Sequence, residues 1–320
     1  MRPLAPSFDR KSVVRLLGTA ASLVLLLYLL GQQEWGAILE AVRGISTVTL
    51  AAVLALLVVS RLAVSARWYM LLRVADPTFP FTESLRLTLA GLFAANFLPT
   101  TIGGDVVRAA GVLALSRNRV GATASIVLDR LVGMAGMMVI LPVGLARLGA
   151  WLGVSAIPSM TGGTWLVVGG GSMEPAPRWR KAWSWLQRVV RRLGETWRLW
   201  VGRPTSIVGA LGFTWIHMLC VFMEIWLLLR AMGGGPSVLT IGGLWSLAYF
   251  ITLIPISING LGLREVSITY IFSELGAIPM ETALTLALIL RTLDILITLP
   301  GALLIPTIRT APESPKGRGP

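Results

Sequence analysis

Long apolar runs constrain the fold of this chain more than any other feature. Several of them reach the roughly 20 residues that a helix needs to cross a bilayer core of about 30 Å. In hydrocarbon, every backbone N–H and C=O group must be paired within the protein, and a helix does this inside one segment. The runs therefore predict an all-α integral membrane protein. They lie at 16–30, 48–59, 126–145, 207–229 and 284–308.

The positive charge of the chain is grouped by loop. Its 28 Lys and Arg residues exceed its 15 Asp and Glu residues, which gives a net charge of +13. In a soluble protein this excess would indicate nucleic acid. Here the positive-inside rule accounts for it, so we expect no nucleic-acid partner. The basic segments predict that both terminal tails, 1–12 and 309–320, are cytoplasmic. The chain is then a multi-pass protein of the cytoplasmic (inner) membrane.

The sequence gives little support for metal, disulfide or nucleotide chemistry. It has one cysteine and one histidine, which excludes a disulfide framework and a Cys/His metal site. We interpret both residues, Cys220 and His217, as packing residues on an apolar helix. No G-x-x-x-x-G-K-[ST] motif occurs. We therefore expect no metal and no cofactor.

The apolar runs and the loop charges together predict about six full spans. The first follows a basic segment and lacks a cleavage site, so we expect it to be retained as a signal anchor. In the second, Arg61 is expected to snorkel toward the interface, and Arg67, Trp68 and Tyr69 to form a basic and aromatic interfacial anchor. The expected spans are 13–30, 47–68, 121–147, 150–171, 204–230 and 282–308, of which 150–171 is interrupted by proline and glycine.

A basic amphipathic segment, 174–203, separates the two halves of the chain. It holds eight Arg and Lys residues against two Glu residues. Its apolar residues recur at alternating spacings of four and three, which predicts one helical stripe. Four tryptophans on that stripe are typical of a helix lying on the cytoplasmic membrane surface. One interpretation is a linker that only anchors, and a sharper one is that 178–200 gathers anionic lipids.

The stretch NFLPTTIGGDVVRAAG, residues 96–111, interrupts an apolar region with helix breakers and charges. Pro99 breaks a helix, Gly103 and Gly104 loosen it further, and Asp105 and Arg108 are costly in hydrocarbon. The apolar segments on either side, 84–98 and 105–116, are each too short for a full span. We therefore expect a re-entrant hairpin of two half-length helices.

The same break recurs in the second half of the chain. Both copies read P-x4-G-x3-R, at an offset of 156 residues. The first break is reached from inside and the second from outside, which is typical of an inverted repeat. We therefore expect two re-entrant broken-helix hairpins within repeats 47–147 and 204–308. The expected breaking residues are Pro99, Gly103, Gly104, Pro255 and Gly260.

Charged residues at these breaks point to an anion site. Arg108 and Arg264 fall in the first turn of the helix that follows each break, and helix N-termini favour anions. Arginine holds phosphate through a planar fork of donors. The span after each break also carries charge: Asp129 and Arg130 in the first half, Arg291 and Asp294 in the second. A purely structural network of ion pairs is the alternative.

The motifs N-F-L-P-T-T-I-G-G-D-V-V-R-A and P-I-S-I-N-G-L-G-L-R-E resemble the flippase-like membrane domain of the lysylphosphatidylglycerol synthase (MprF) family, including its stand-alone YbhN-type members. The similarity covers roughly residues 10–308, which we take as one transmembrane domain, 13–308. In that family the two motifs are associated with lipid translocation. With the resemblance, the candidate substrate-binding residues are Asn96, Asp105, Arg108, Asp129, Arg130, Asn259, Arg264, Glu265, Arg291 and Asp294, with Glu224 as a weaker candidate.

The resemblance implies a lipid translocator that moves an anionic phospholipid or a polyprenyl-phosphate-linked lipid between leaflets. Larger family members append a soluble aminoacyl transferase domain. Only twelve residues follow Ile308 here, so we expect that domain to be absent and the chain not to be an enzyme. Two alternatives stay open. One is an integral-membrane enzyme acting on a lipid phosphate, and the other is an accessory subunit of a lipid or glycan biosynthetic system. A lipid-modifying enzyme or a glycosyltransferase is the expected protein partner.

Overall fold

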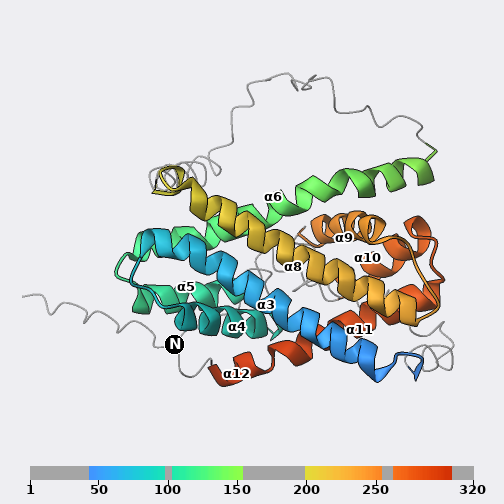
Figure 1. The fold of residues 1–320 in the computed structure, drawn as a ribbon, viewed down its shortest axis with the longest axis horizontal. Helices are drawn as coiled ribbons and strands as arrows, with labels where there is room; N and C mark the ends of the chain where they lie inside the picture. The colour runs from blue at the N-terminus through green and yellow to red at the C-terminus, as the bar shows by residue number, and fades with distance from the viewer. Residues whose placement is uncertain (1–42, 98–102, 154–198, 254–261, 305–320) are drawn as a thin grey trace, which may run out of the picture.

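In the computed structural model, the residues described are 43–97, 103–153, 199–253 and 262–304, and all regular structure within them is helical. The helices, drawn in chain order in Figure 1, are α3 (Thr47–Ala75), α4 (Phe81–Phe97), α5 (Gly103–Leu115), α6 (Arg119–Trp151), α8 (Pro204–Ala231), α9 (Val238–Thr252), α10 (Leu263–Tyr270), the π-helical turn η2 (Ile271–Leu275), α11 (Met280–Thr298) and α12 (Pro300–Leu304).

Four of these helical segments are long and apolar enough to cross a membrane. They are α3, α6, α8 and the continuous segment Met280–Leu304, and each overlaps one of the expected spans. The chain is therefore a multi-pass membrane protein. The expected span 13–30, nearly all of 150–171 and all but the last two residues of the surface helix 178–200 lie outside the described residues. Trp200 is described, and its expected place on the membrane surface is wrong: it is 1% exposed, with Nε1 donating to the Leu71 carbonyl at 2.9 Å. Trp151 belongs to the end of α6.

Local sequence explains where the long helices begin. Ser46 precedes α3, and its Oγ accepts a hydrogen bond from the Thr49 backbone N–H at 3.1 Å. Asn118 precedes α6 and accepts in the same way from Gly121 N–H at 3.0 Å. Such side chains satisfy donors that the first helical turn leaves unpaired. Pro204 opens α8, where the missing N–H costs nothing.

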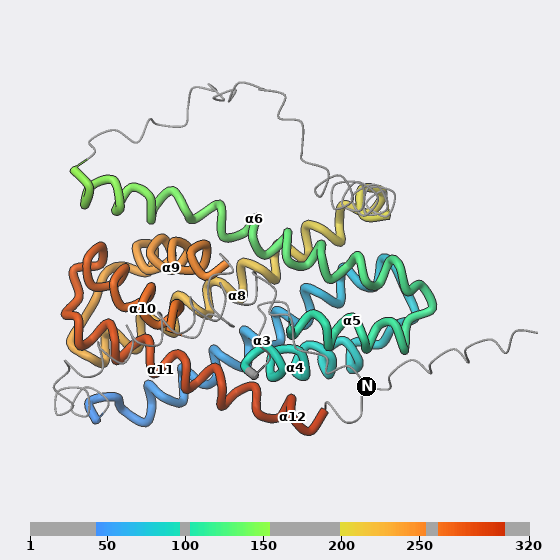
Figure 2. Tube along the Cα trace, turned by 180° about the vertical axis from the view of Figure 1, so that it is seen from behind, coloured from blue at the N-terminus to red at the C-terminus, as the bar shows by residue number. Residues whose placement is uncertain are grey.

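The two halves of the chain repeat one order of helices. Each has a long helix, two short helices and a second long segment. In the first half, α3, α4, α5 and α6 have 29, 17, 13 and 33 residues. In the second half, α8 and α9 have 28 and 15 residues, α10 and η2 have 8 and 5, and the segment Met280–Leu304 has 25. At 1.5 Å per residue, α4 is only about 25 Å long. The pair α4–α5 and the pair α9–α10 lie at opposite ends of the molecule (Figures 1 and 2).

The halves pack against each other reciprocally. The first helices, α3 and α8, lie along one another. The last segment of each half contacts the second helix of the other, so α6 packs on α9, and α11 with α12 packs on α4. Glycine permits the closest approach: a Cβ on Gly243 would lie 2.6 Å from the Gly144 backbone N. Gly301 of α12 meets the Leu89 backbone of α4 in the same manner.

Asp76 lies at the end of the molecule where the helix pair α4–α5 joins α3 and α6, and its contacts hold the two connecting turns together. Its carboxylate accepts hydrogen bonds from Thr78 Oγ1 at 2.7 Å, Ser116 Oγ at 2.8 Å and Arg117 N–H at 2.9 Å. It therefore joins the α3–α4 turn to the α5–α6 turn. Burial alone would raise the pKa of this carboxyl, but the hydrogen bonds outweigh burial and lower the pKa below its usual value.

We expect Asp76→Asn to lower the stability of the purified protein at neutral pH by about 1–3 kcal/mol, because four donors, the Thr78 backbone N–H included, lose a charged acceptor. A depressed carboxyl pKa stabilises the fold above the usual Asp pKa near 4, and that contribution disappears as the pH falls through the folded-state pKa. Thermal unfolding in detergent from pH 7 down to pH 3 checks this. The gap between the wild type and the variant should close at the acid end. A gap that stays constant with pH would contradict the assignment.

Exposed residues at two helix ends allow the expected membrane orientation to be tested. Arg119, at the start of α6, and Glu281, at the start of α11, both have exposed side chains. If the basic loops are cytoplasmic, Glu281→Cys should react with an impermeant maleimide added to intact cells, and Arg119→Cys only after permeabilisation. Both variants carry Cys220→Ala, which removes the buried native thiol. The opposite labelling pattern would reverse the orientation that we expect.

Candidate functional site

The first charge cluster joins three helices of the first half. Arg67 Nε of α3 donates to Asp129 Oδ1 of α6 at 2.7 Å, and Arg108 Nη2 of α5 donates to Asp129 Oδ2 at 3.0 Å. Arg108 also reaches Asp105 on its own helix, at 3.2 Å between Nη1 and Oδ1. Arg130 of α6 pairs with the other Asp105 oxygen. Asp129 is therefore buried between two arginines.

The second charge cluster has the same arrangement, with one arginine supplied from the first half. Asp294 of α11 pairs with Arg61 of α3, and its second oxygen accepts from Arg264 Nη2 of α10 at 2.7 Å. Arg291 of α11 lies 3.7 Å from Glu265 of α10, measured from Nε to Oε1. Here too, a central aspartate is held by one arginine from α3 and one from the half-length helix.

A tryptophan lies beside the half-helix arginine in each cluster. The Arg108 guanidinium carbon lies 4.0 Å from the centroid of a Trp68 ring on α3. The Arg264 guanidinium lies 5.6 Å from a Trp245 ring on α9. Such cation–π contacts strengthen when the pair is removed from water. Each half-helix arginine is thus held by both an aromatic face and an aspartate.

Positive charge is in excess at the first cluster. Each cluster contains three arginines against two carboxylates. Glu224 of α8 is also buried, at 3% exposure, and lies near the second cluster, where the charges of Asp294, Arg61 and Arg264 act on it. The second cluster therefore has a third acidic group nearby. A surplus of arginine beside a cavity favours an anionic ligand.

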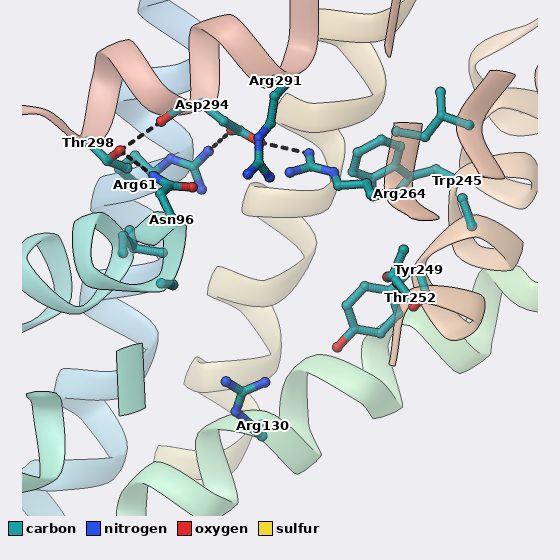
Figure 3. A pocket seen from close by; sticks show the side chains of 14 residues that line it. Arg61, Asn96, Arg130, Trp245, Tyr249, Thr252, Arg264, Arg291, Asp294 and Thr298 are labelled. Atoms are coloured by element: carbon teal, nitrogen blue, oxygen red, sulfur yellow. Dashed lines mark hydrogen bonds and ion pairs between the residues drawn. The ribbon is translucent and has the colours of Figure 1, made fainter. Parts of the chain in front are cut away.

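Two cavities separate the clusters. One, of about 340 Å³, lies between Asp294 on one side and Arg130 on the other, with Tyr249 and Trp245 along its wall (Figure 3). The second, of about 200 Å³, is lined by the first cluster and by His217. The two cavities have Leu92, Ala95, Arg130 and Tyr249 in common, so they adjoin. The first is within the size range of small-ligand sites.

His217 lies between the two clusters. Its Nδ1 is 2.7 Å from the Ser60 hydroxyl of α3, and the charges of Arg67, Arg61, Asp294 and Asp129 all act on it. It therefore helps to join α8 to α3 at the wall of the smaller cavity. The sequence interpretation of His217 as a packing residue left out this polar contact.

The structure brings most of the sequence-predicted site residues together. Asn96 of α4 lines the larger cavity and donates from Nδ2 to Thr298 Oγ1 at 2.9 Å. Gly104, at the start of α5, lies against the Gly91 backbone of α4, where a Cβ would clash. Asp105, Arg108, Asp129, Arg130, Arg264, Glu265, Arg291 and Asp294 form the two clusters described above. Pro99, Pro255, Asn259 and Gly260 lie outside the described residues.

The expected interfacial roles of Arg61, Arg67 and Trp68 are wrong. Arg67 is 9% exposed and holds Asp129, and Trp68 is fully buried with Nε1 donating to Ser125 at 3.1 Å. Arg61 bonds to Asp294 instead of snorkelling. One signal was present: unpaired arginines in an apolar span are costly, so each required a buried acidic partner.

A family model for the transmembrane region of lysylphosphatidylglycerol synthase matches residues 15–301. The chain belongs to this family. The resemblance of the two Pro-Gly-Arg motifs is thus confirmed, and the match takes in both charge clusters and both cavities. The family associates the chain with lipid metabolism as a membrane domain. No curated protein matches the sequence.

The double pairing of Asp129 predicts an ordered loss of stability. Asp129→Ala leaves Arg67 and Arg108 buried without their shared carboxylate, and breaking such a buried pair costs about 3–5 kcal/mol. Asp105→Ala, the matched control, should cost less, because the Arg130 side chain is 44% exposed and can be solvated. Thermal unfolding of both variants in the same detergent checks the order. Equal losses would mean that Asp129 is no more central than Asp105.

Proposed function

We propose that this chain is a lipid translocator, which moves an anionic lipid between the leaflets of the cytoplasmic membrane. One observation carries the proposal: each half-helix arginine bonds to an aspartate that a second arginine also holds. Arg108 can therefore turn from Asp129 to a phosphate while Arg67 keeps that aspartate paired. Arg264 and Arg61 stand in the same relation to Asp294. Ligand exchange then leaves no buried charge without a partner.

Arg108 also has donor capacity to offer a ligand. Its Nη atoms are used by Asp105 and Asp129, while its Nε is buried with no hydrogen-bond partner among the described residues. A guanidinium presents five N–H donors and matches phosphate oxygens in a planar fork. Arg108 lines the smaller cavity and Arg264 the larger, so each cavity has one such arginine.

The reciprocal packing of the two halves supports an inverted repeat, in which the two hairpins enter from opposite membrane faces. In such folds one repeat rocks against the other around a central site, so that the site faces each side in turn. The adjoining cavities between the clusters are the natural position for a head group during this exchange. We infer that the basic loops and both termini are cytoplasmic, and that the segment 178–200, up to the buried Trp200, rests on anionic lipid.

The enzyme alternative receives less support. Hydrolysis or group transfer needs a nucleophile with a base beside it, or a metal ion. The Ser60 hydroxyl has His217 beside it, but Ser60 is 1% exposed and lines neither cavity. Within the described ranges, no group of three or more His, Cys, Asp or Glu side chains converges on a common point. The acids at the cavities are bound by arginines, and an arginine-bound carboxylate is a poor base. A partner enzyme would then make or consume the lipid that this chain moves.

Reconstitution into liposomes tests the proposal. Purified full-length protein should exchange a head-group-labelled anionic phospholipid between leaflets without ATP, and mass spectrometry should recover the lipid intact. Phosphatidylglycerol, its aminoacylated form and a polyprenyl-phosphate sugar cover the anionic classes. A cleaved or transferred head group would favour the enzyme. Failure to exchange any lipid extracted from the native membrane would favour an accessory subunit.

We expect Arg108→Ala and Arg264→Ala each to reduce this exchange at least tenfold, while insertion and yield stay near the wild type. Arg→Lys should recover little, because an ammonium lacks the bidentate fork. Arg230→Ala is the matched control: this exposed arginine lies 5.3 Å from the Trp226 ring and lines neither cavity. If the two cluster variants fail to accumulate in the membrane, the arginines are structural.

A further inference from the structure

A third cavity opens between α5 and α6 on the outer surface of the bundle. It holds about 390 Å³. Its wall is almost wholly apolar, and Val106, Val127 and Leu131 are 59%, 43% and 50% exposed. The one hydroxyl among its lining residues, on Thr123, donates a hydrogen bond to the Arg119 backbone carbonyl at 2.8 Å. The residues of this α5–α6 groove are Asp105, Val106, Ala109, Thr123, Ile126, Val127, Arg130 and Leu131.

The groove ends at the first charge cluster. Asp105 and Arg130 form an ion pair, and both residues line the groove and the smaller cavity. Arg130 also lines the larger cavity, so its side chain borders all three spaces. At 44% exposure, it is the most exposed charged side chain of the two clusters. An apolar surface path thus leads to a cation that borders the interior cavities.

We propose that the α5–α6 groove is the lateral entrance to the site, and that the acyl chain of an anionic phospholipid occupies it while Arg130 binds the phosphate. This inference rests on the proposed function and names how its ligand arrives. The apolar wall suits a hydrocarbon chain and offers nothing to a polar molecule. The charge at its inner end has the sign that a phospholipid head group requires.

The Asp105–Arg130 pair acts as the gate of this entrance. When the phosphate draws Arg130 away, Asp105 keeps Arg108 as its partner at 3.2 Å. Opening the pair therefore leaves Asp105 with an ionic partner. The corresponding pair in the second half, Arg291 and Glu265, is less exposed, with side chains 15% and 5% exposed. The second half lacks an equally exposed pair, so entry is assigned to the first.

Photocrosslinking separates this inference from simple contact with bulk lipid. The full-length protein in nanodiscs is exposed to phosphatidylglycerol with a diazirine midway along one acyl chain, or to phosphatidylcholine with the same group. Crosslinked peptides are then mapped by mass spectrometry. We expect saturable phosphatidylglycerol labelling between residues 105 and 131. Labelling should fall at least fivefold in Arg130→Gln, while the weaker phosphatidylcholine labelling stays unchanged.

Bulky substitutions give a second, independent measurement. Val127→Trp fills the groove from a side chain that already faces outward, and should reduce both the labelling and the initial exchange rate severalfold. Val139→Trp is the matched control, because Val139 lies on the same helix, is 64% exposed and does not line the groove. Equal labelling by both lipids that neither Arg130→Gln nor Val127→Trp changes would overturn the proposal that the groove is the entrance.

Two further outcomes are distinguishable. Disulfide formation between chains carrying Val127→Cys in a Cys220→Ala background would show that a second copy occupies the groove, and would overturn the proposal. Head-group-selective labelling without any leaflet exchange would support lipid binding in the groove and refute the proposed translocation. Exchange that requires Arg108 and Arg264 but is unchanged by Arg130→Gln and Val127→Trp would support the proposed translocation and refute the groove as its entrance.

Discussion

The double pairing of two buried aspartates is the interaction on which the rest of the structure depends. In a low-dielectric interior an unpaired carboxylate is far too costly, so Asp129 and Asp294 each need cationic partners. Helix α3 supplies one partner to each, through Arg67 and Arg61. These two arginines are six residues apart, or about 9 Å along the helix axis. One helix therefore sets the spacing of the two clusters, and with it the width of the cavities between them.

Much of the fold could be predicted from local sequence. Apolar run length gave α3, α6, α8 and the last span, because hydrocarbon permits few alternatives to a helix. The half-length helices α4 and α5 matched the expected segments to within a few residues, because a proline such as Pro99 predicts a helix end. Gly103 and Gly104, expected to break the helix, are instead the first two residues of α5. Ion pairs between distant residues were beyond this reasoning. Arg61 meets Asp294 across 233 positions and Arg67 meets Asp129 across 62, and hydropathy carries no signal that matches an arginine to one acid and not to another.

The close packing between the two halves could not be predicted from the sequence for a related reason. Gly144 and Gly243 lie on different helices, and their backbones touch only because neither has a Cβ. Glycine is common in this sequence, with 34 residues, so its presence alone does not identify a contact. Small residues that allow helices to approach closely are a general device of membrane proteins, where van der Waals packing replaces the hydrophobic effect. The contact brings α9 against α6, and so places Tyr249 and Arg130 on the wall of one cavity.

A rigid ion network and a binding site make different demands on such clusters. A network that serves stability alone is best when every donor and acceptor is used, because a buried polar atom without a partner is costly. Here Arg108 Nε and Glu265 Oε2 are buried without hydrogen-bond partners among the described residues, while both central aspartates have more than one arginine. Pairing is thus duplicated at the two central aspartates and incomplete at Arg61 Nε, Arg108 Nε and Glu265 Oε2. That distribution contributes less to stability than a fully paired network would, but it suits arginines that exchange one anion for another.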